Sequence, residues 1–529
     1  DMTLAILKAK DYTLKTIVPK DEYLKLKDTG NLSTGGTAED VTDIVHPYNV
    51  FMAERISRII GLDICGIDVM TSAIDIPLNE TGGAVLEVNA APGFRMHLAP
   101  SSGLGRNVAS HVMDMLYPQG ATSRIPIVAV TGTNGKTTTT RLIAHMMRLK
   151  GLKVGYTTTD GVYIQNRLLM KGDCTGPASA EFVLKDPTVN FAVLECARGG
   201  LLRAGLGFKR CDIGIVTNVA ADHLGLKGIH TLDQLSKVKG VIPEVVLPSG
   251  HAILNADDDR VYEMRLNVKC NVALFSMDEN SPRIKKHAAN GGISAIYENG
   301  YITVMKGEWK IRITKAVNVP LTMGGRADFM IQNVLPATLT AYLREFSVED
   351  IKVALESFIP SPSQTPGRLN LFQFKNFNIL LDYAHNAAGF RALSKLIAKM
   401  DGSPKVGIIA GVGDRRDEDT KELGAIAAEM FDEIIIRQDR NLRGKSEKEL
   451  IGLLEDGINS VDPKKPRKVI RLEEEAIAYA IKNATPGSLI VVSSDVVPAA
   501  LEQVMKFKED EVKDLYGSFD KGNIPNMTN

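Results

Sequence analysis

A short glycine-containing segment between an apolar run and a helical pattern constrains the fold most. The apolar run Ile125–Val130 comes first, then T-G-T-N-G-K-T-T, then Arg141–Lys150 with helical spacing. This order of strand, loop and helix is typical of phosphate-binding loops in α/β domains. Backbone N–H groups of such a loop, together with the helix N-terminus, bind anions. We therefore expect the phosphates of ATP to bind Gly132, Thr133, Asn134, Gly135, Lys136, Thr137 and Thr138.

Two side chains of this loop have the chemistry of nucleotide sites. Lys136 is expected to bridge the β- and γ-phosphates, and the Thr137 hydroxyl is expected to bind Mg²⁺. The spacing differs from the usual G-x-x-x-x-G-K-[ST], because Val130 stands five residues before Gly135. The alternative is a glycine-rich turn that arose by chance, which the surrounding strand and helix argue against.

Length and charge limit the remaining possibilities. A chain of 529 residues suggests three or four domains. Lys plus Arg and Asp plus Glu are both 63, so nothing in the net charge favours nucleic acid or an anionic membrane. No apolar stretch reaches the roughly 18–20 residues of a membrane helix. The five cysteines are widely spread without a C-x-x-C pair, which predicts reduced thiols in a cytoplasmic protein without a zinc site.

Strand-like and helix-like runs alternate over most of the chain, which predicts parallel sheets covered by helices. Short alternating runs at about 268–320 predict an antiparallel flap inserted in the first α/β domain. The chain begins at Asp1 rather than Met, so we expect further sequence upstream. The expected segments are an N-terminal unit (1–118), a linker (119–125), a central ATP-binding domain (126–362), a Rossmann-like C-terminal domain (363–505) and a polar tail that frays (506–529).

Five motifs occur in the same order as in the Mur ligases and folylpolyglutamate synthetases, and the chain resembles that superfamily from 126 to about 500. After G-T-N-G-K-T come L-E-C-A-R-G-G (194–200), N-V-A-A-D-H-L-G (218–225), the segment 325–333 and D-Y-A-H-N (382–386). The resemblance implies a mechanism in which a carboxylate attacks ATP to give an acyl phosphate, which an amine then attacks.

The same resemblance implies roles for single residues. Lys136, Glu195, His223 and Arg368 would be catalytic, with Thr137, Glu195 and His223 holding Mg²⁺. Asn333, Asp382 and His385 would contact the adenine or ribose. Lys239 falls where several Mur ligases carry a carbamylated lysine, although a surface lysine explains it equally well. The alternative for His223 is a core histidine that caps a loop.

The N-terminal unit has a different origin. G-I-D-V (66–69) and L-E-V-N-A-A-P-G (86–93) resemble the end of an ATP-grasp fold. Glu87 and Asn89 point to the same side of a strand, and with Asp68 they offer oxygen ligands to Mg²⁺. The alternative is an acidic strand edge. A complete ATP-grasp domain also needs an upstream lobe, which this chain does not contain, and the segment 31–36 would be a substrate loop of the half that is present.

The combination of partial ATP-grasp and Mur-like parts resembles the cyanophycin synthetase family. Further strings carry this resemblance: 87–100, 157–162 (T-T-T-D-G-V), 172–180, 194–203, 411–419 (G-V-G-D-R-R-D-E-D) and 439–445 (D-R-N-L-R-G-K). It implies ATP and Mg²⁺ as cofactors and aspartate, arginine and a cyanophycin primer as partners, in a cytoplasmic homo-oligomer. The ATP-grasp domain would add Asp to the backbone, and the Mur-like domain would add Arg to its side chain.

Charged residues, several of them in expected loops of the last domain, are candidates for substrate binding. A guanidinium is recognised by carboxylates in bidentate geometry, which Asp414, Asp417 and Asp439 offer. Arg198 would hold carboxylates of the polymer, and Lys239 lies in the same group; solvated loop charge explains these residues equally well. Two other functions stay open: a Mur-type ligase acting on a cell-wall peptide or folate, and a switch or scaffold that binds ATP without turnover.

Overall fold

The computed structural model describes residues 2–26, 32, 35–121, 123–438, 442 and 444–519. The chain divides into two compact units, Asp1–Arg124 and Ile125–Asn529, and each is described by itself. No helix among the described residues is both long and apolar enough to cross a membrane.

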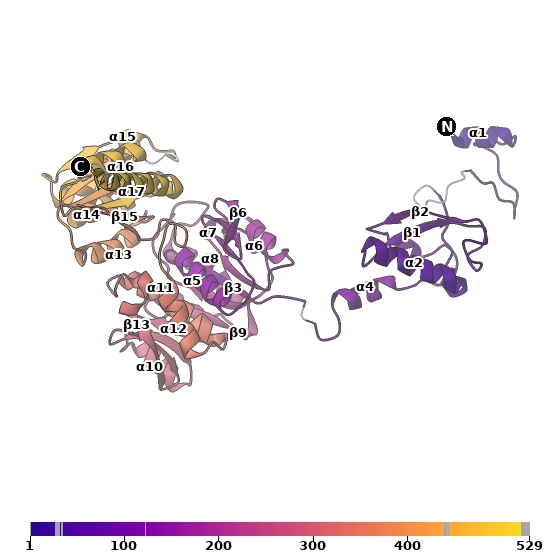
Figure 1. Ribbon diagram of the computed structural model, residues 1–529, viewed down its shortest axis with the longest axis horizontal. Helices are drawn as coiled ribbons and strands as arrows, with labels where there is room; N and C mark the ends of the chain where they lie inside the picture. The colour runs from indigo at the N-terminus through magenta and orange to yellow at the C-terminus, as the bar shows by residue number, and fades with distance from the viewer. Residues whose placement is uncertain are drawn as a thin grey trace, which may run out of the picture. The chain divides into compact units, whose positions relative to one another are not determined.

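Unit 1 is small and contains the predicted helix and two strands (Figure 1). Strands β1 (Gly66–Met70) and β2 (Ala84–Asn89) pair antiparallel. Helix α2 (Pro47–Ile60) starts with proline at its first turn and ends at Gly61 in the left-handed conformation. Of the described apolar side chains in this unit, only Leu7 and Leu78 are buried. Its other elements are α1 (Met2–Ala9), η2 (Thr42–Ile44), α3 (Arg95–Leu98) and α4 (Val108–Leu116).

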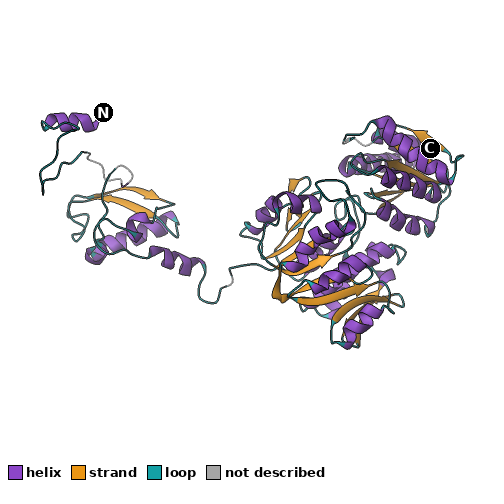
Figure 2. Ribbon diagram, turned by 180° about the vertical axis from the view of Figure 1, so that it is seen from behind, coloured by secondary structure: helices purple, strands orange, loops and turns teal. Residues whose placement is uncertain are grey.

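The first half of unit 2 contains an eleven-stranded mixed sheet in the order β13-β12-β11-β10-β9-β8-β3-β7-β4-β5-β6 (Figures 1 and 2). The run from β11 to β4 is parallel, and antiparallel hairpins flank it on both sides. The strands are β3 (Ile127–Thr131), β4 (Val154–Thr158), β5 (Gly161–Ile164), β6 (Arg167–Lys171), β7 (Phe191–Glu195), β8 (Cys211–Val216), β9 (Val246–Asn255), β10 (Asn271–Ser276), β11 (Ile293–Glu298), β12 (Tyr301–Lys306) and β13 (Trp309–Lys315).

Strand β3 shows why the centre of this sheet reads as a continuous apolar run. All five of its residues are buried, and successive side chains point to opposite faces. Val128 and Val130 belong to one core with Leu142 of α5, while Ala129 belongs to another core with Ile242 of α8. The helices are α5 (Lys136–Leu149), α6 (Pro177–Leu184), α7 (Arg198–Ala204), α8 (Leu232–Glu244), α9 (Asp259–Glu263), α10 (Pro282–Ala289), α11 (Asp328–Leu343) and α12 (Val348–Ser357), with 3₁₀ turns η3 (Met264–Leu266), η4 (Ala316–Asn318) and η5 (Pro320–Thr322).

The predicted antiparallel flap at 268–320 is wrong for its first two strands. Strand β10 runs parallel to β9, and β11 runs parallel to β10, so both extend the main sheet. Helix α10 lies between them and supplies the crossover that a parallel pair requires. Antiparallel pairing begins at β12, which pairs with β11 on one side and with β13 on the other, at the sheet edge.

The C-terminal part of unit 2 is a six-stranded sheet in the order β14-β15-β19-β16-β17-β18, parallel except for β14. Its four predicted strands are all present. The elements are β14 (Asn370–Gln373), β15 (Asn378–Asp382), α13 (Ala387–Ala398), β16 (Lys405–Ala410), α14 (Asp417–Met430), β17 (Glu433–Arg437), α15 (Glu447–Val461), β18 (Arg467–Val469), α16 (Glu473–Lys482), β19 (Leu489–Ser493) and α17 (Val497–Phe519).

The expected polar tail from 506 does not begin there, because α17 continues to Phe519. Within this segment, the Glu511 carboxylate accepts hydrogen bonds from the Lys375 N–H (2.8 Å) and from Lys508 (2.6 Å). The Lys508 ammonium also lies 5.1 Å from the centre of the Phe374 ring. Charged composition therefore concealed a helix that packs against the β14–β15 turn.

Helices α14 and α15 approach so closely that glycine is required between them, which gives a stability prediction. A Cβ added to Gly457 would lie 1.9 Å from the Lys421 carbonyl oxygen, whereas one at Gly452 of the same helix meets nothing within 4 Å. Gly457→Ala should lower the free energy of unfolding by about 1–3 kcal/mol or more. Gly452→Ala should raise it by about 0.5–1 kcal/mol. Urea unfolding measures both, and equal effects would contradict the close contact.

Candidate active site

The phosphate loop connects β3 to α5, and its two glycines are dictated by close contacts. Gly132 and Gly135 have φ angles of +148° and +88°. A Cβ on Gly132 would lie 1.8 Å from the Thr217 hydroxyl oxygen, and one on Gly135 would lie 2.1 Å from Asn333 Oδ1. Since α5 begins at Lys136, the loop presents the N-terminus of a fourteen-residue helix.

The loop forms one wall of a cavity of about 920 Å³, and the predicted catalytic and nucleotide residues line it together. Residues from the central and C-terminal parts of unit 2 share this lining. They are Gly132, Thr133, Asn134, Gly135, Lys136, Thr137, Thr138, Glu195, His223, Asn333, Arg368, Asp382 and His385.

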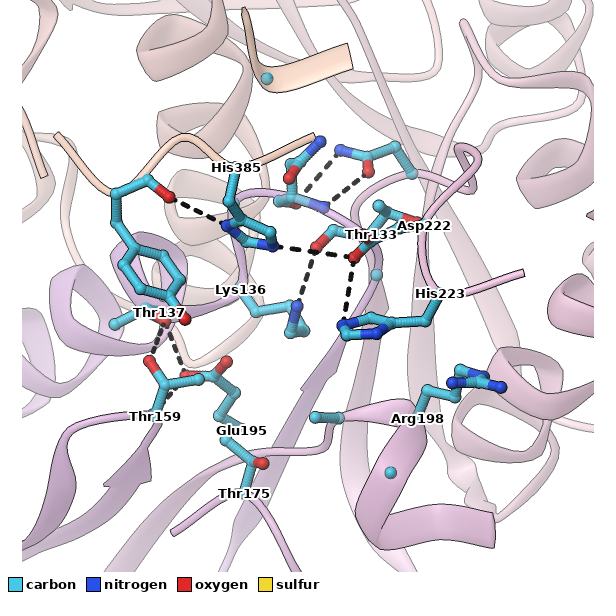
Figure 3. A pocket seen from close by; sticks show the side chains of 18 of the residues that line it. Thr133, Lys136, Thr137, Thr159, Thr175, Glu195, Arg198, Asp222, His223 and His385 are labelled. Carbon is cyan, nitrogen blue, oxygen red and sulfur yellow. Dashed lines mark hydrogen bonds and ion pairs between the residues drawn. The ribbon is translucent and has the colours of Figure 1, made fainter. Parts of the chain in front are cut away.

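A buried carboxylate lies next to the loop (Figure 3). Glu195 is 2% exposed, and its Oε2 accepts hydrogen bonds from the Thr137 hydroxyl (2.9 Å) and the Thr159 N–H (3.3 Å). No described residue donates a hydrogen bond to its Oε1. Burial raises the pKa of Glu195, and the Lys136 charge and the Thr137 hydrogen bond only partly offset this effect.

This arrangement fits a magnesium ion. The Thr137 hydroxyl and Glu195 are hard oxygen ligands, and a cation would satisfy the unpaired Oε1. Within the described part of the chain, no group of three or more His, Cys, Asp or Glu residues forms a metal site. Mg²⁺ takes few protein ligands and fills its octahedron with phosphate and water, so a site of this kind does not require such a group.

Two lysine ammonium groups donate hydrogen bonds to backbone carbonyl oxygens of the loop. Lys136 Nζ donates to the Thr133 carbonyl oxygen (2.8 Å), and Lys239 Nζ donates to that of Gly132 (2.7 Å). Lys239 is 3% exposed, so it is not the surface lysine that the sequence allowed. Burial, with repulsion from Lys136, lowers the pKa of Lys239 to about 7.

A charged cluster joins the two halves of unit 2 around Asp222. The Arg415 guanidinium lies 2.8 Å from Asp222 Oδ1, 2.7 Å from Asp414 and 2.6 Å from His223 Nδ1. Burial alone would raise the pKa of Asp222, but its interaction with His385 and the charge of Arg415 lower this pKa well below its usual range. Both ring nitrogens of His223 face Arg415, so His223 is not arranged as a metal ligand here.

The D-Y-A-H segment is held by its own aspartate. Asp382 accepts hydrogen bonds from the N–H groups of Leu369 (3.0 Å) and Ala384 (2.8 Å). His385 Nδ1 lies 2.9 Å from the Tyr383 carbonyl oxygen, which aims Nε2 at Asp222 at 3.9 Å (Figure 3). Asp382 therefore fixes the loop that carries His385 and the strand that follows Arg368.

Comparison with known proteins decides the family. Residues 130–341 match the Mur ligase middle domain, and residues 367–496 match the Mur ligase glutamate ligase domain. Cyanophycin synthetase of Geminocystis herdmanii is 50% identical over 505 residues, which are 96% of this chain and 58% of that protein. The Synechocystis cyanophycin synthetase is 51% identical over 94% of this chain and 57% of that protein. The chain belongs to the Mur ligase family, as a homologue of the cyanophycin synthetases.

A solved structure agrees with this membership at the level of the fold. A bifunctional folylpolyglutamate synthase/dihydrofolate synthase covers 77% of this chain and 96% of its own, with a TM-score of 0.53 and 19% identity. The predicted α/β fold class and the expected ATP-dependent ligase family are thus confirmed. The chain spans less than three-fifths of the two cyanophycin synthetases.

In unit 1 of this cyanophycin synthetase homologue, the predicted oxygen ligands come together. Asp68 and Glu87 are directly opposite each other in the β1–β2 pair, so they share a face. Asn89 Nδ2 donates to Glu87 Oε1 (3.1 Å). Asp68 and Glu87 are both exposed on the strand pair.

The predicted substrate residues divide into three groups. Arg198, Lys239 and Asp414 line the cavity. Asp417 does not; it is exposed and forms an ion pair with Lys445 at 2.5 Å, because it occupies the first turn of α14. Asp439 lies outside the described residues, as do several residues of the segment 31–36.

The sequence interpretation missed Arg415, which contacts Asp222 and His223 of the central domain as well as Asp414. The string G-V-G-D-R-R-D-E-D contains it, but guanidinium binding was expected from the acidic residues of this string. An arginine flanked by aspartates at a strand end is a usable signal for an ion-pair network. Thr159 was missed because its contribution to Glu195 is a backbone N–H, which no side-chain pattern reveals.

The burial of Glu195 predicts that, in the protein without nucleotide or metal, the free energy of unfolding falls as the pH rises. In the unfolded chain this carboxyl ionises around its ordinary pKa of 4.5. In the folded state its pKa is raised, so it stays protonated at pH values at which the unfolded chain has already lost the proton. Stability therefore falls as pH rises above 4.5 through the raised pKa, and Glu195→Gln should escape this loss. We expect the thermal midpoint of Glu195→Gln to exceed that of the wild type by a margin that grows with pH. A margin independent of pH would contradict this.

Proposed function

We propose that this chain is an ATP-dependent amide ligase of cyanophycin synthesis that joins arginine to an aspartate side-chain carboxylate of the polymer. The observation that carries the proposal is the cavity in which the phosphate loop, Glu195 and groups of the C-terminal domain meet. The 50% identity to cyanophycin synthetase over almost the whole chain supports the choice of substrate. Aspartate, arginine and a primer are the partners, in a cytoplasmic homo-oligomer.

The chemistry begins with attack of the aspartate carboxylate on the γ-phosphorus of ATP, which releases ADP and forms an acyl phosphate. The α-amine of arginine then attacks the acyl carbon, the tetrahedral intermediate collapses, and phosphate leaves as the amide forms. Lys136 and Arg368 neutralise the charge that develops on the phosphoryl oxygens. Thr137 and Glu195 would hold Mg²⁺, which supplies further neutralisation of the phosphates when bound. The folylpolyglutamate synthase structure named above contains Mn, AMPPNP and L-glutamate.

The other cavity residues position the reactants. Asn333 and His385 contact the adenine or ribose, and Asp382 acts through the loop that it fixes. Arg198 holds carboxylates of the acidic polymer, while Asp414 faces the amine side. A metal or phosphate role for His223 requires Arg415 to move away from its imidazole ring. We assign no substrate role to Asp417, because its carboxylate is engaged by Lys445.

Unit 1 is proposed as the C-terminal part of an ATP-grasp domain. Asp68, Glu87 and Asn89 present oxygen atoms on one face, as a Mg²⁺–ATP site requires. In a complete ATP-grasp domain this site would serve the addition of aspartate to the backbone.

Replacing the loop lysine tests the proposal. Purified protein is incubated with ATP, Mg²⁺, arginine and a primer that ends in aspartate, and phosphate release is measured. Lys136→Ala should lower the arginine-dependent rate of phosphate release by roughly 10²–10³-fold, because the negative charge that develops on the phosphoryl oxygens in the transition state loses the lysine ammonium that stabilises it. Lys150→Ala, at the C-cap of the same helix, is the control, since Lys150 is exposed and pairs with Asp350. Phosphate release with a cell-wall peptide or folate in place of arginine and primer would overturn the substrate assignment.

Lys239 is proposed as a carbamylated lysine beside the loop. A lysine with a pKa of about 7 is largely neutral at mildly alkaline pH, as reaction with CO₂ requires. In ¹³C-bicarbonate the wild type should show a carbamate signal by NMR. Lys239→Met should lose it, while Lys237→Met, at an exposed position of α8, should retain it. A signal that survives in Lys239→Met would contradict the assignment.

A further inference from the structure

Two side-chain amides meet across the boundary between the central and C-terminal domains. Asn134 Nδ2 donates to Asn386 Oδ1 at 3.2 Å, and Asn386 Nδ2 donates back to Asn134 Oδ1 at 3.0 Å. The two residues are 252 positions apart in the chain. Asn134 belongs to the phosphate loop, and Asn386 directly follows His385 at the start of α13.

The orientation of this pair is determined on the C-terminal side. Asn386 is the N-cap of α13, and its Oδ1 accepts the Gly389 N–H at 2.8 Å. Its NH₂ group therefore faces the other way and needs an acceptor, because Asn386 is only 5% exposed. Asn134 Oδ1 provides that acceptor.

The backbone of Asn134 is fixed on the central-domain side. Its N–H donates to Asn218 Oδ1 (2.9 Å), and its carbonyl oxygen accepts from the Thr217 hydroxyl (2.6 Å) and Asn218 Nδ2 (3.1 Å). Residues that directly follow β8 thus hold the backbone of Asn134, and its side chain pairs with the N-cap of α13. The position of the phosphate loop is therefore connected to the position of the C-terminal domain.

Other contacts across the same boundary differ from this pair. Arg415 pairs with Asp222 away from the loop, and Lys399 pairs with Asp328 at 2.9 Å in an exposed position. The amide pair alone among these three involves the phosphate loop itself. It is also neutral, so it neither repels the phosphates nor competes for them.

We propose that the Asn134–Asn386 amide pair is a latch that couples nucleotide binding to closure of the C-terminal domain. The proposal rests on ATP as the ligand of the proposed function, and it does not depend on the identity of the amine. Both asparagines are positioning residues, which align the loop with the segment carrying His385. Because apparent affinity scales with the fraction of protein in the binding-competent state, opening the latch weakens nucleotide binding.

The test compares Asn386→Ser with the wild type. Serine still caps α13 but is too short to pair with Asn134. Nucleotide affinity is measured with AMPPNP and Mg²⁺, and closure with spin labels at exposed Glu349 of α12 and Asp456 of α15. We expect roughly tenfold weaker nucleotide binding and a broader, longer distance distribution, since about two hydrogen bonds are lost. The carboxylate of Asn386→Asp can still accept a hydrogen bond from Asn134. The nucleotide affinity of this variant should therefore lie between those of Asn386→Ser and the wild type.

Non-additivity gives the decisive comparison. Asn134→Ser should weaken binding to a similar extent, and adding Asn386→Ser to it should change little further. Lys399→Met removes the exposed contact at the C-cap of α13, and its nucleotide affinity should stay within about twofold of the wild type. The latch is overturned by an unchanged affinity in Asn386→Ser, by additive effects, or by an equal effect of Lys399→Met. Failure of the wild type to bind AMPPNP would instead contradict the proposed function.

Discussion

The arrangement of the site depends on the backbone of the phosphate loop lying in direct contact with side chains of two other elements. Gly132 lies against Thr217, which follows β8, and Gly135 lies against Asn333 of α11. Any Cβ at either glycine would push the loop away from these elements. The start of α5, and with it Lys136 and Thr137, is thereby placed beside Glu195 at the end of β7. Two tight packing contacts thus set the relation between the nucleotide loop and the buried carboxylate.

The central domain and the C-terminal domain contribute different kinds of groups. Those of the central domain are buried and fixed by short hydrogen bonds, as with Glu195 and Lys239. Those of the C-terminal domain reach across a boundary, and they are held by ion pairs and by the Asn134–Asn386 amides. The proposed acyl phosphate chemistry needs both properties, since the phosphates must be held tightly while ADP and product must leave in each cycle.

Contiguous motifs in the sequence were sufficient to find side chains that the structure brings together in one cavity. The G-T-N-G-K-T and D-Y-A-H-N strings placed the loop and His385 correctly in one cavity. The strand β10 was misread because parallel and antiparallel strands share the same short apolar pattern, and the crossover helix α10 has only eight residues. The end of α17 was misread because its charged residues have partners, such as Lys375, that are far away in the sequence.

The least predictable parts of the site are those in which a residue type has the opposite role from the one expected. Aspartates were expected to bind a substrate guanidinium, yet Asp414 already lies against Arg415 of its own chain. In the proposed reaction, the guanidinium of the substrate must replace this internal contact or bind beside it, and the charge of Arg415 helps to keep Asp222 ionised. Under this proposal, exchange of one guanidinium for another leaves neither Asp222 nor Asp414 buried without a cationic partner, and a buried carboxylate without such a partner would be costly.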